Sequence, residues 1–328
     1  MVEDDDRRPA QQPRSSSGAS SAQFLAPIPA APRISANIAL ERRHASLNAR
    51  LKLRNLAITD LPDQSAGAPV RLTEATRDRL SVFSTGDNED CRRVLGPVHS
   101  AEWPSLEGCL GVVFTSRAGS SYLARELAVR RRIGRMEEAF SPNFVQGLAA
   151  ADMIRSFADG WFSFKLGVRG LITAELCGVI PQYLEKMHFV LLLRRDIVAQ
   201  AVSLVKANQT GQWHSIHAPT GEPRYDAARI ADSARNIAAG VASLRRYLQL
   251  TKRPWRPLYY EDFEHGDFTG AEAICDEFGV PPAAPGTGPK LKPLDRTADA
   301  VNAEWITRFQ GDIDHTTRAA IDRYAAQL

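Results

Sequence analysis

Short apolar runs that alternate with helical segments constrain the fold of this chain most strongly. The runs are Cys109–Phe114, Trp161–Val168, His188–Arg195 and Trp255–Phe263. Their length and their content of β-branched and aromatic residues are typical of buried strands. Helical spacing follows in "SYLARELAVRRR", "DIVAQAVSLVKANQ" and Ala227–Leu250. This alternation predicts an α/β fold, with a central, mostly parallel sheet and helices on both faces.

Composition divides the chain into three parts. Residues 1–35 are rich in Pro, Ser, Ala and Gln, and predict a disordered N-terminal tail. Residues 36–105 form an N-terminal extension that is partly helical, since Ile38–Leu56 has leucines at helical spacing. Within it, "TGDNED" and "GPVHSAEWP" are predicted to be loops. Residues 106–328 hold the alternating strands and helices and are predicted to form the main domain.

Charge and composition exclude several classes of protein. The net charge of +3 is too slight to indicate nucleic-acid or membrane binding, so any anion site must be local. The apolar run Phe189–Leu193 is far shorter than a membrane span, and the N-terminus lacks the apolar segment of a signal peptide. The cysteines have no spacing that suits zinc. We therefore predict a cytoplasmic protein with no integral membrane segment, no metal, and thiols at Cys91, Cys109, Cys177 and Cys275.

The first polar strand-to-helix corner is "TSRAGSS". Small residues let the backbone approach a phosphate or sulfate, and the following helix offers free N–H groups. Arg117 adds a planar, permanent charge, while Ser120 and Ser121 offer hydroxyls or helix caps. No Walker A pattern is present, which argues against an ordinary ATPase. A purely structural turn remains the alternative interpretation.

The second corner is "LLLRRDIVAQAVS". Arg194 and Arg195 stand at the strand end, and Ser203 lies two turns into the next helix, so an arginine and a hydroxyl can grip one phosphate. Alternatively, the arginines are a solvated strand end. Because ligands of parallel α/β sheets bind at the carboxyl ends of the strands, the two corners together predict a ligand with two separate anionic groups. ATP does not require two such sites, whereas an adenosine with a 3′-phosphate and a 5′-phosphosulfate does.

Five stretches carry a family resemblance: "TSRAGSSYLARELA", "GRMEEAF", "FKLGV", "LLRRDIVAQAVSLVKANQTGQWH" and "LDRTADAVNAEWITRF". In this order the chain resembles the Stf0-type bacterial sulfotransferases, a family that includes trehalose sulfotransferases. The resemblance implies a P-loop-like three-layer αβα sandwich over residues 106–328. It also implies sulfuryl transfer from 3′-phosphoadenosine 5′-phosphosulfate (PAPS) to a hydroxyl of a carbohydrate or glycolipid, without a metal. It suggests a homodimer.

The resemblance assigns the donor site by residue. The segment Arg117, Ala118, Gly119, Ser120 and Ser121 corresponds to the loop that holds the 5′-phosphosulfate. The clamp on the 3′-phosphate corresponds to Ser203 with one of two arginines. Stf0 spacing favours Arg194, while the spacing of sulfotransferases in general favours Arg195. Arg296 in "LDRTAD" corresponds to a residue near the 3′ side.

The acceptor side carries the predicted base. Glu138 corresponds to the family's general base, with Glu137 as the alternative, although Met136 and Ala139 depart from the family pattern. From the chemistry of sulfuryl transfer, Lys165 either stabilises the departing phosphate or is an ordinary strand-end lysine. In "NQTGQWHSIH", Trp213 is predicted to stack on a sugar face, and His214 to line the pocket or the surface.

Two other functional classes remain open from the sequence. One is a kinase-like, phosphate-binding transferase on the same layout, against which the missing Walker lysine counts. The other is a non-catalytic relative that binds nucleotide or acts as a scaffold. The position of the Glu138 carboxylate relative to the Arg117 loop separates the enzyme from the scaffold.

Overall fold

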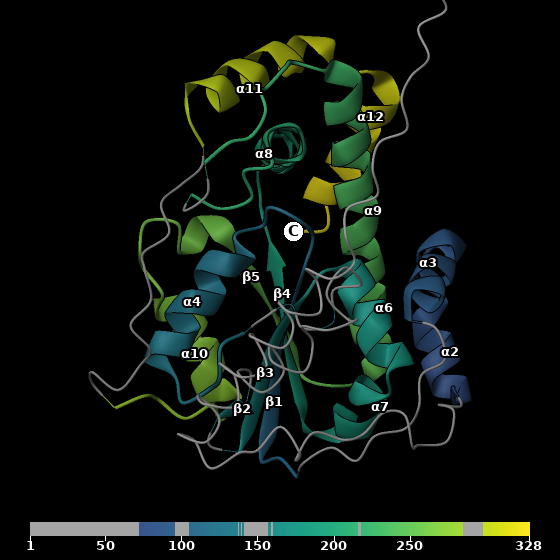
Figure 1. The fold of residues 1–328 in the computed structure, drawn as a ribbon, viewed down its shortest axis with the longest axis vertical. Helices are drawn as coiled ribbons and strands as arrows, with labels where there is room; N and C mark the ends of the chain where they lie inside the picture. The colour runs from purple at the N-terminus through teal and green to yellow at the C-terminus, as the bar shows by residue number, and fades with distance from the viewer. Residues whose placement is uncertain are drawn as a thin grey trace, which may run out of the picture. The chain divides into compact units, whose positions relative to one another are not determined.

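A sheet in the order β2-β3-β1-β4-β5 organises the fold (Figure 1). The strands are β1 (Gly108–Phe114), β2 (Phe157–Ala158), β3 (Trp161–Leu166), β4 (Met187–Leu193) and β5 (Trp255–Tyr259). All run parallel except β2, which pairs antiparallel to β3. The structure, a computed structural model, describes residues 72–95, 105–136, 138, 140, 157–158, 160–215, 218–284 and 298–328. The four predicted strands are all present in it.

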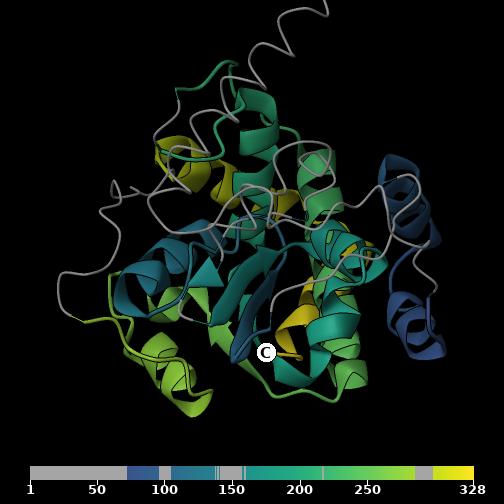
Figure 2. The ribbon, with the colours of Figure 1, turned by 60° about the horizontal axis from the view of Figure 1, so that its bottom comes forward.

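Helices cover both faces of the sheet. One face carries α4 (Ser120–Arg130) and α10 (Thr269–Glu277), and the other carries α6 (Val168–Leu176), α7 (Val179–Tyr183) and α9 (Ala227–Thr251), as Figures 1 and 2 show. Successive residues of β1 point to opposite faces, so Leu110 and Val112 pack towards α4 while Cys109 and Val113 enter the other cluster. Burial on both faces explains the continuous apolar runs. The predicted three-layer αβα sandwich is confirmed.

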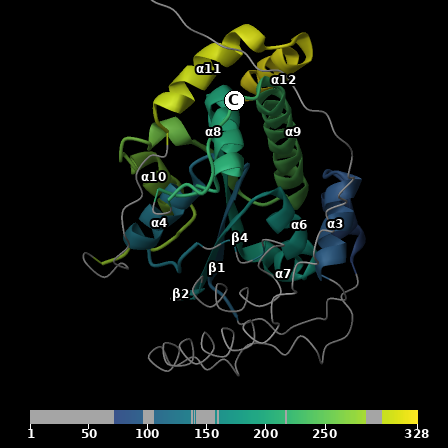
Figure 3. The same ribbon diagram turned by 45° about the horizontal axis from the view of Figure 1, so that its top comes forward.

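Three further helices surround the carboxyl end of β4. The helix α8 (Ile197–Thr210) follows β4 and packs against α9 and α11 (Ala300–Asp312), and α12 (His315–Ala325) packs against α9 (Figure 3). Short 3₁₀ turns, η2 (Leu184–Lys186) and η3 (Tyr260–Asp262), precede β4 and follow β5. Among the described residues, no helix combines the length and apolarity needed to cross a bilayer.

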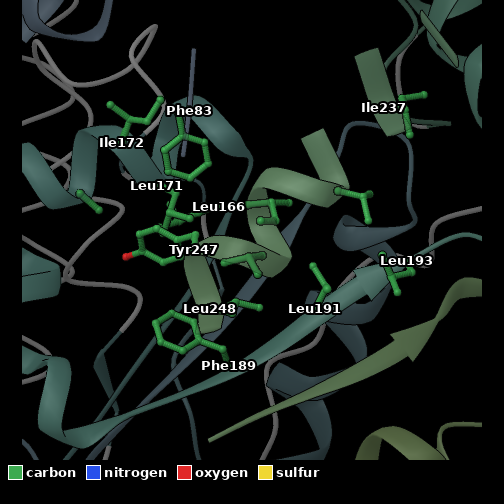
Figure 4. Packing of buried hydrophobic residues seen from close by; sticks show 14 of the residues in the cluster. Phe83, Leu166, Leu171, Ile172, Phe189, Leu191, Leu193, Ile237, Tyr247 and Leu248 are labelled. Carbon is green, nitrogen blue, oxygen red and sulfur yellow. The ribbon is translucent and has the colours of Figure 1, made fainter. Parts of the chain in front are cut away.

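Two helices ahead of the sheet join its core. These are α2 (Glu74–Leu80) and α3 (Thr85–Leu95), which contact α9 and α6, respectively. Phe83, in the turn between them, packs 5.6 Å from the ring of Tyr247 on α9, in the cluster that Figure 4 shows. Nearby, Glu175 is fully buried and accepts hydrogen bonds from Arg79 (2.6 Å and 3.0 Å) and from the Tyr247 hydroxyl (2.6 Å). Residues 74–95 are therefore packed into the same core as the sheet.

The helix α3 corrects one prediction. "TGDNED" was expected to be a loop but forms the first turns of α3. Ser84 caps this end, since its hydroxyl accepts from the Asp87 amide at 3.0 Å and donates to the Asp87 carboxylate at 2.7 Å. The spacing Ser-x-x-Asp is a helix-start pattern that outweighs the turn-forming residues here. The predicted helix at Ile38–Leu56 and the predicted loop "GPVHSAEWP" lie outside the described residues, as does the whole predicted tail.

Candidate active site

The two predicted corners meet at the carboxyl ends of β1 and β4. These strands are neighbours in the sheet, but the chain leaves β1 into α4 on one face and leaves β4 into α8 on the other. At such a reversal α/β proteins generally bind their ligands, between the two loops. The candidate site is this junction of the two loops, called the crevice below.

The β1–α4 loop is tightly turned. Arg117 has φ 68° and Gly119 has φ 88°, both in the left-handed region. Only glycine fits at the second position, because a Cβ there would lie 2.4 Å from the ring of Tyr260. Ala118 and Ser120 are buried, and no side chain caps the N-terminus of α4. The loop thus brings backbone, rather than bulky side chains, to the start of the helix.

Arg117 connects the two corners directly. Its Nε donates to the Ser203 hydroxyl on α8 at 2.9 Å, and its Nη1 donates to the Trp213 carbonyl oxygen at 2.5 Å. The residue predicted for one anionic group therefore contacts the residue predicted for the other. Burial lowers the pKa of Arg117, and the neighbouring charge of Arg194 lowers it further. Two guanidinium groups held close together in a partly buried crevice favour the binding of an anion.

The two arginines after β4 differ sharply in their surroundings. The Arg194 side chain is 15% exposed, lies over the Tyr260 ring at 4.9 Å, and reaches Glu261 only at 3.9 Å. Its buried Nε has no hydrogen-bond partner among the described residues. The Arg195 side chain is 46% exposed and already bonds Asp262 at 2.7 Å. Arg194 therefore has the free capacity that an anion would use.

The corner after β4 is fixed by η3 and by the C-terminal helix. The Glu261 carboxylate accepts from the amides of Arg195 (3.0 Å) and Asp196 (3.3 Å), and the Asp196 side chain caps α8. The Tyr324 hydroxyl on α12 donates to the Arg194 carbonyl oxygen at 2.5 Å. These bonds hold the backbone of the corner in place while leaving the Arg194 side chain available.

Lys165 links the predicted base to the start of α4. Its Nζ donates to the Ser121 hydroxyl at 3.1 Å and to Glu138 Oε1 at 2.5 Å. The alternation along β3 turns Lys165 towards the face that α4 covers, where its side chain is 10% exposed. Because Lys165 bonds both groups, the Glu138 carboxylate lies near Ser121 in the first turn of α4. The Glu138 side chain is 39% exposed, so the carboxylate remains accessible.

Of the remaining predicted residues, the structure describes Trp213 and His214. Trp213 is 42% exposed and follows α8, with its backbone held by Arg117. His214 is half-buried beside it in the chain. Arg296 and Glu137 lie outside the described residues. Within the described part of the chain, no group of three or more His, Cys, Asp or Glu side chains is arranged to hold a metal ion.

A comparison with protein families bears on the class of this protein. Residues 174–312 match the family model described as Stf0 sulphotransferase. Over this segment the chain is similar to the Stf0 sulphotransferases, which supports the family resemblance. A comparison with curated proteins finds no match.

The family match confirms the resemblance inferred from sequence, and it supports a transferase of the sulfotransferase class. The matched part of the chain runs from the end of α6 to the end of α11. It contains the corner of Arg194 and Ser203, whereas Arg117, Lys165 and Glu138 precede it.

Sequence reasoning missed three residues of the crevice. Tyr260 lies against both Gly119 and Arg194, Glu261 fixes the second corner, and Gln200 on α8 bonds the β1–α4 loop. The "YYED" stretch at the end of the fourth predicted strand follows a carboxyl end, as the two corners do. This position was the one available signal for Tyr260 and Glu261.

Proposed function

We propose that this protein transfers a sulfuryl group from PAPS to a hydroxyl of a carbohydrate or glycolipid, with Glu138 as the general base. One observation carries the proposal: Arg117, from the end of β1, donates at 2.9 Å to Ser203 on α8, the helix that follows Arg194 at the end of β4. The Nε of Arg194, which has no hydrogen-bond partner within the described ranges, supports the fit of a ligand with a second anionic group. A kinase-like transferase is not favoured, because the family match is to sulfotransferases.

Different residues of the crevice would bind the two ends of PAPS. When bound, PAPS supplies the activated sulfuryl group. Arg117 and the backbone N–H groups at the start of α4 would hold the 5′ end, and Arg194 with Ser203 the 3′-phosphate. Lys165, which bonds Ser121, would add positive charge near the oxygen atoms of the 5′-phosphosulfate. Arg117 and Lys165 are already bonded to Ser203 and Ser121, respectively, which would limit their reorganisation during transfer.

Glu138 would remove the proton from the acceptor hydroxyl. Its carboxylate is accessible and is paired with Lys165, so the proton would pass from the acceptor oxygen to a carboxylate oxygen at the entrance of the crevice. The exposed ring of Trp213 would pack against the apolar face of a sugar. A homodimer stays a prediction.

The test combines binding and turnover. Wild-type protein should bind 3′-phosphoadenosine 5′-phosphate (PAP) in a calorimetric titration, and ADP should bind more weakly. With PAPS and a panel of sugars and glycolipids, an acceptor should gain one sulfuryl group in mass spectrometry. Glu138→Gln should lower kcat by about 10²- to 10⁴-fold and leave the Kd of PAP unchanged.

Glu304→Gln provides the matched control. Glu304 is an exposed glutamate on α11, and the same substitution there should leave turnover unchanged. Folded wild-type protein that does not bind PAP would refute the PAPS proposal. Binding without turnover on any acceptor would favour the non-catalytic alternative.

A further inference from the structure

Gln200 is a buried amide that contacts the β1–α4 loop. Its side chain is fully buried on α8, one helical turn before Ser203. Its Nε2 donates to three oxygen atoms: the Thr115 hydroxyl at 3.0 Å, the Ser116 carbonyl at 2.8 Å and the Thr115 carbonyl at 3.4 Å. One side chain on α8 therefore bonds the loop that begins the opposite corner.

The groups around Gln200 require a hydrogen-bond donor at this position. β1 ends at Phe114, so the carbonyl groups of Thr115 and Ser116 lie beyond the last residue of the ladder, where the chain turns into the left-handed Arg117. Carbonyl groups in such a place need a donor. The Thr115 carbonyl also accepts from the Ala118 amide at 3.3 Å, so the shorter bond from Gln200 to the Ser116 carbonyl, at 2.8 Å, carries the argument. Three oxygens surround the nitrogen of Gln200, while its Oε1 has no hydrogen-bond partner among the described residues. A donor, and not an acceptor, is therefore required at this position.

We infer that Gln200 is a positioning residue that holds the β1–α4 loop at the correct distance from Ser203 for a donor with two anionic groups. The inference rests on the proposed function. Because Gln200 is fully buried, it would act on the ligand only through the backbone of Thr115 and Ser116. Because Gln200 and Ser203 are on one helix, the loop and the clamp are set by the same rigid element.

The experiment separates the two ends of the ligand. Calorimetric titrations use PAP, adenosine 5′-phosphate and adenosine 3′-phosphate. Gln200→Met should weaken the two ligands that carry a 5′ group by about tenfold, as expected for a lost donor to a buried loop, and leave adenosine 3′-phosphate within about twofold. Ser203→Ala should weaken the ligands with a 3′-phosphate most, and adenosine 5′-phosphate less, because the Ser203 hydroxyl also accepts from Arg117.

Gln209→Met is the matched control. Gln209 is on the same helix and also bonds a loop backbone, through Arg224, but away from β1. The three dissociation constants of Gln209→Met should stay within about twofold of wild type. If Gln200→Met fails to fold by circular dichroism, Thr115→Val removes one of the three oxygens and should give the same selective loss, at about threefold.

The titrations test the positioning role of Gln200 separately from the proposed function. Equal weakening of all three ligands by Gln200→Met, or no weakening, would overturn the positioning role while leaving the proposed function intact. Wild-type protein that binds none of the ligands would refute the proposed function, and the role of Gln200 with it.

Discussion

Replacing Arg194 or Arg195 should have very different effects on donor binding. The buried Nε of Arg194 has no hydrogen-bond partner in the part of the chain that the structure describes, whereas Arg195 already forms an exposed ion pair with Asp262. A hydrogen bond to a charged group contributes about 1.5–3 kcal/mol, so Arg194→Ala should raise the Kd of PAP by about 10- to 150-fold. An exposed ion pair contributes about 0.2–1 kcal/mol, so Arg195→Ala should change the Kd by less than about fivefold.

Calorimetry measures both variants under one salt concentration, because ionic strength changes the affinity of an exposed anion site. Arg194→Lys adds information, since lysine keeps the charge but loses the planar fork that grips a phosphate from two sides. We expect its Kd to lie between those of wild type and Arg194→Ala. A larger loss in Arg195→Ala than in Arg194→Ala would refute the assignment and restore the clamp to Arg195.

Three further predictions concern the frame around the crevice. Arg79→Met leaves the Glu175 charge buried and should lower the free energy of unfolding by about 3–5 kcal/mol in urea titrations; a loss under about 1 kcal/mol would contradict this. Gly119→Ala should cost about 1–2 kcal/mol in backbone strain alone and should abolish PAP binding in calorimetry, so unchanged affinity would be evidence against the tight loop. The pKa of Asp299 is raised by burial but lowered more by bonds from Lys206 and from backbone amides, for a net decrease. The ionised Asp299 carboxylate should therefore stabilise the fold above its unfolded pKa of about 4. This stabilisation should be lost as the pH falls through the lower pKa that Asp299 has in the folded protein. Asp299→Asn should therefore show a smaller loss of stability on acidification, and an identical pH profile would contradict the shift.

The sheet could be predicted because β1, β3 and β4 are buried along almost their whole length, on both faces, whereas β5 exposes Arg256 and Pro257. Cys109–Phe114 was predicted and Gly108–Phe114 is observed, and the ends of β3, β4 and β5 shift by only a few residues. Continuous apolar runs have no other common explanation at this length. The two-residue β2 has no such pattern and was not predicted, nor was α3, whose start depends on the single hydroxyl of Ser84.

The positions of the site residues were predictable, but their contacts were not. A strand end followed by a helix indicates that Arg117 and Arg194 lie at the carboxyl edge of the sheet, but it does not indicate the contacts of their side chains. The bond from Arg117 to Ser203 joins residues 86 positions apart, and the bond from Gln200 to Thr115 joins residues 85 apart. A buried glutamine on an apolar helix face gives no sign, in sequence, of the oxygen atoms that it will meet.

The family match ends inside a structural unit and does not define one. Residues 174–312 include β4 and β5 but neither β1 nor β3. β1 is the central strand, paired with β3 on one side and β4 on the other, so the matched part alone would keep only a two-stranded sheet. Two strands are at best marginally stable without the rest of the sheet.

The same argument extends to the functional residues. Ser203 in the matched part is bonded to Arg117, and Gln200 to Thr115, across the junction between β4 and β1. Glu175, which belongs to the matched part, has Arg79 of α2 as its buried counter-ion. Arg117 and Thr115, which precede the match, thus bond residues inside it, so the candidate site draws on both the matched and the unmatched parts of the chain.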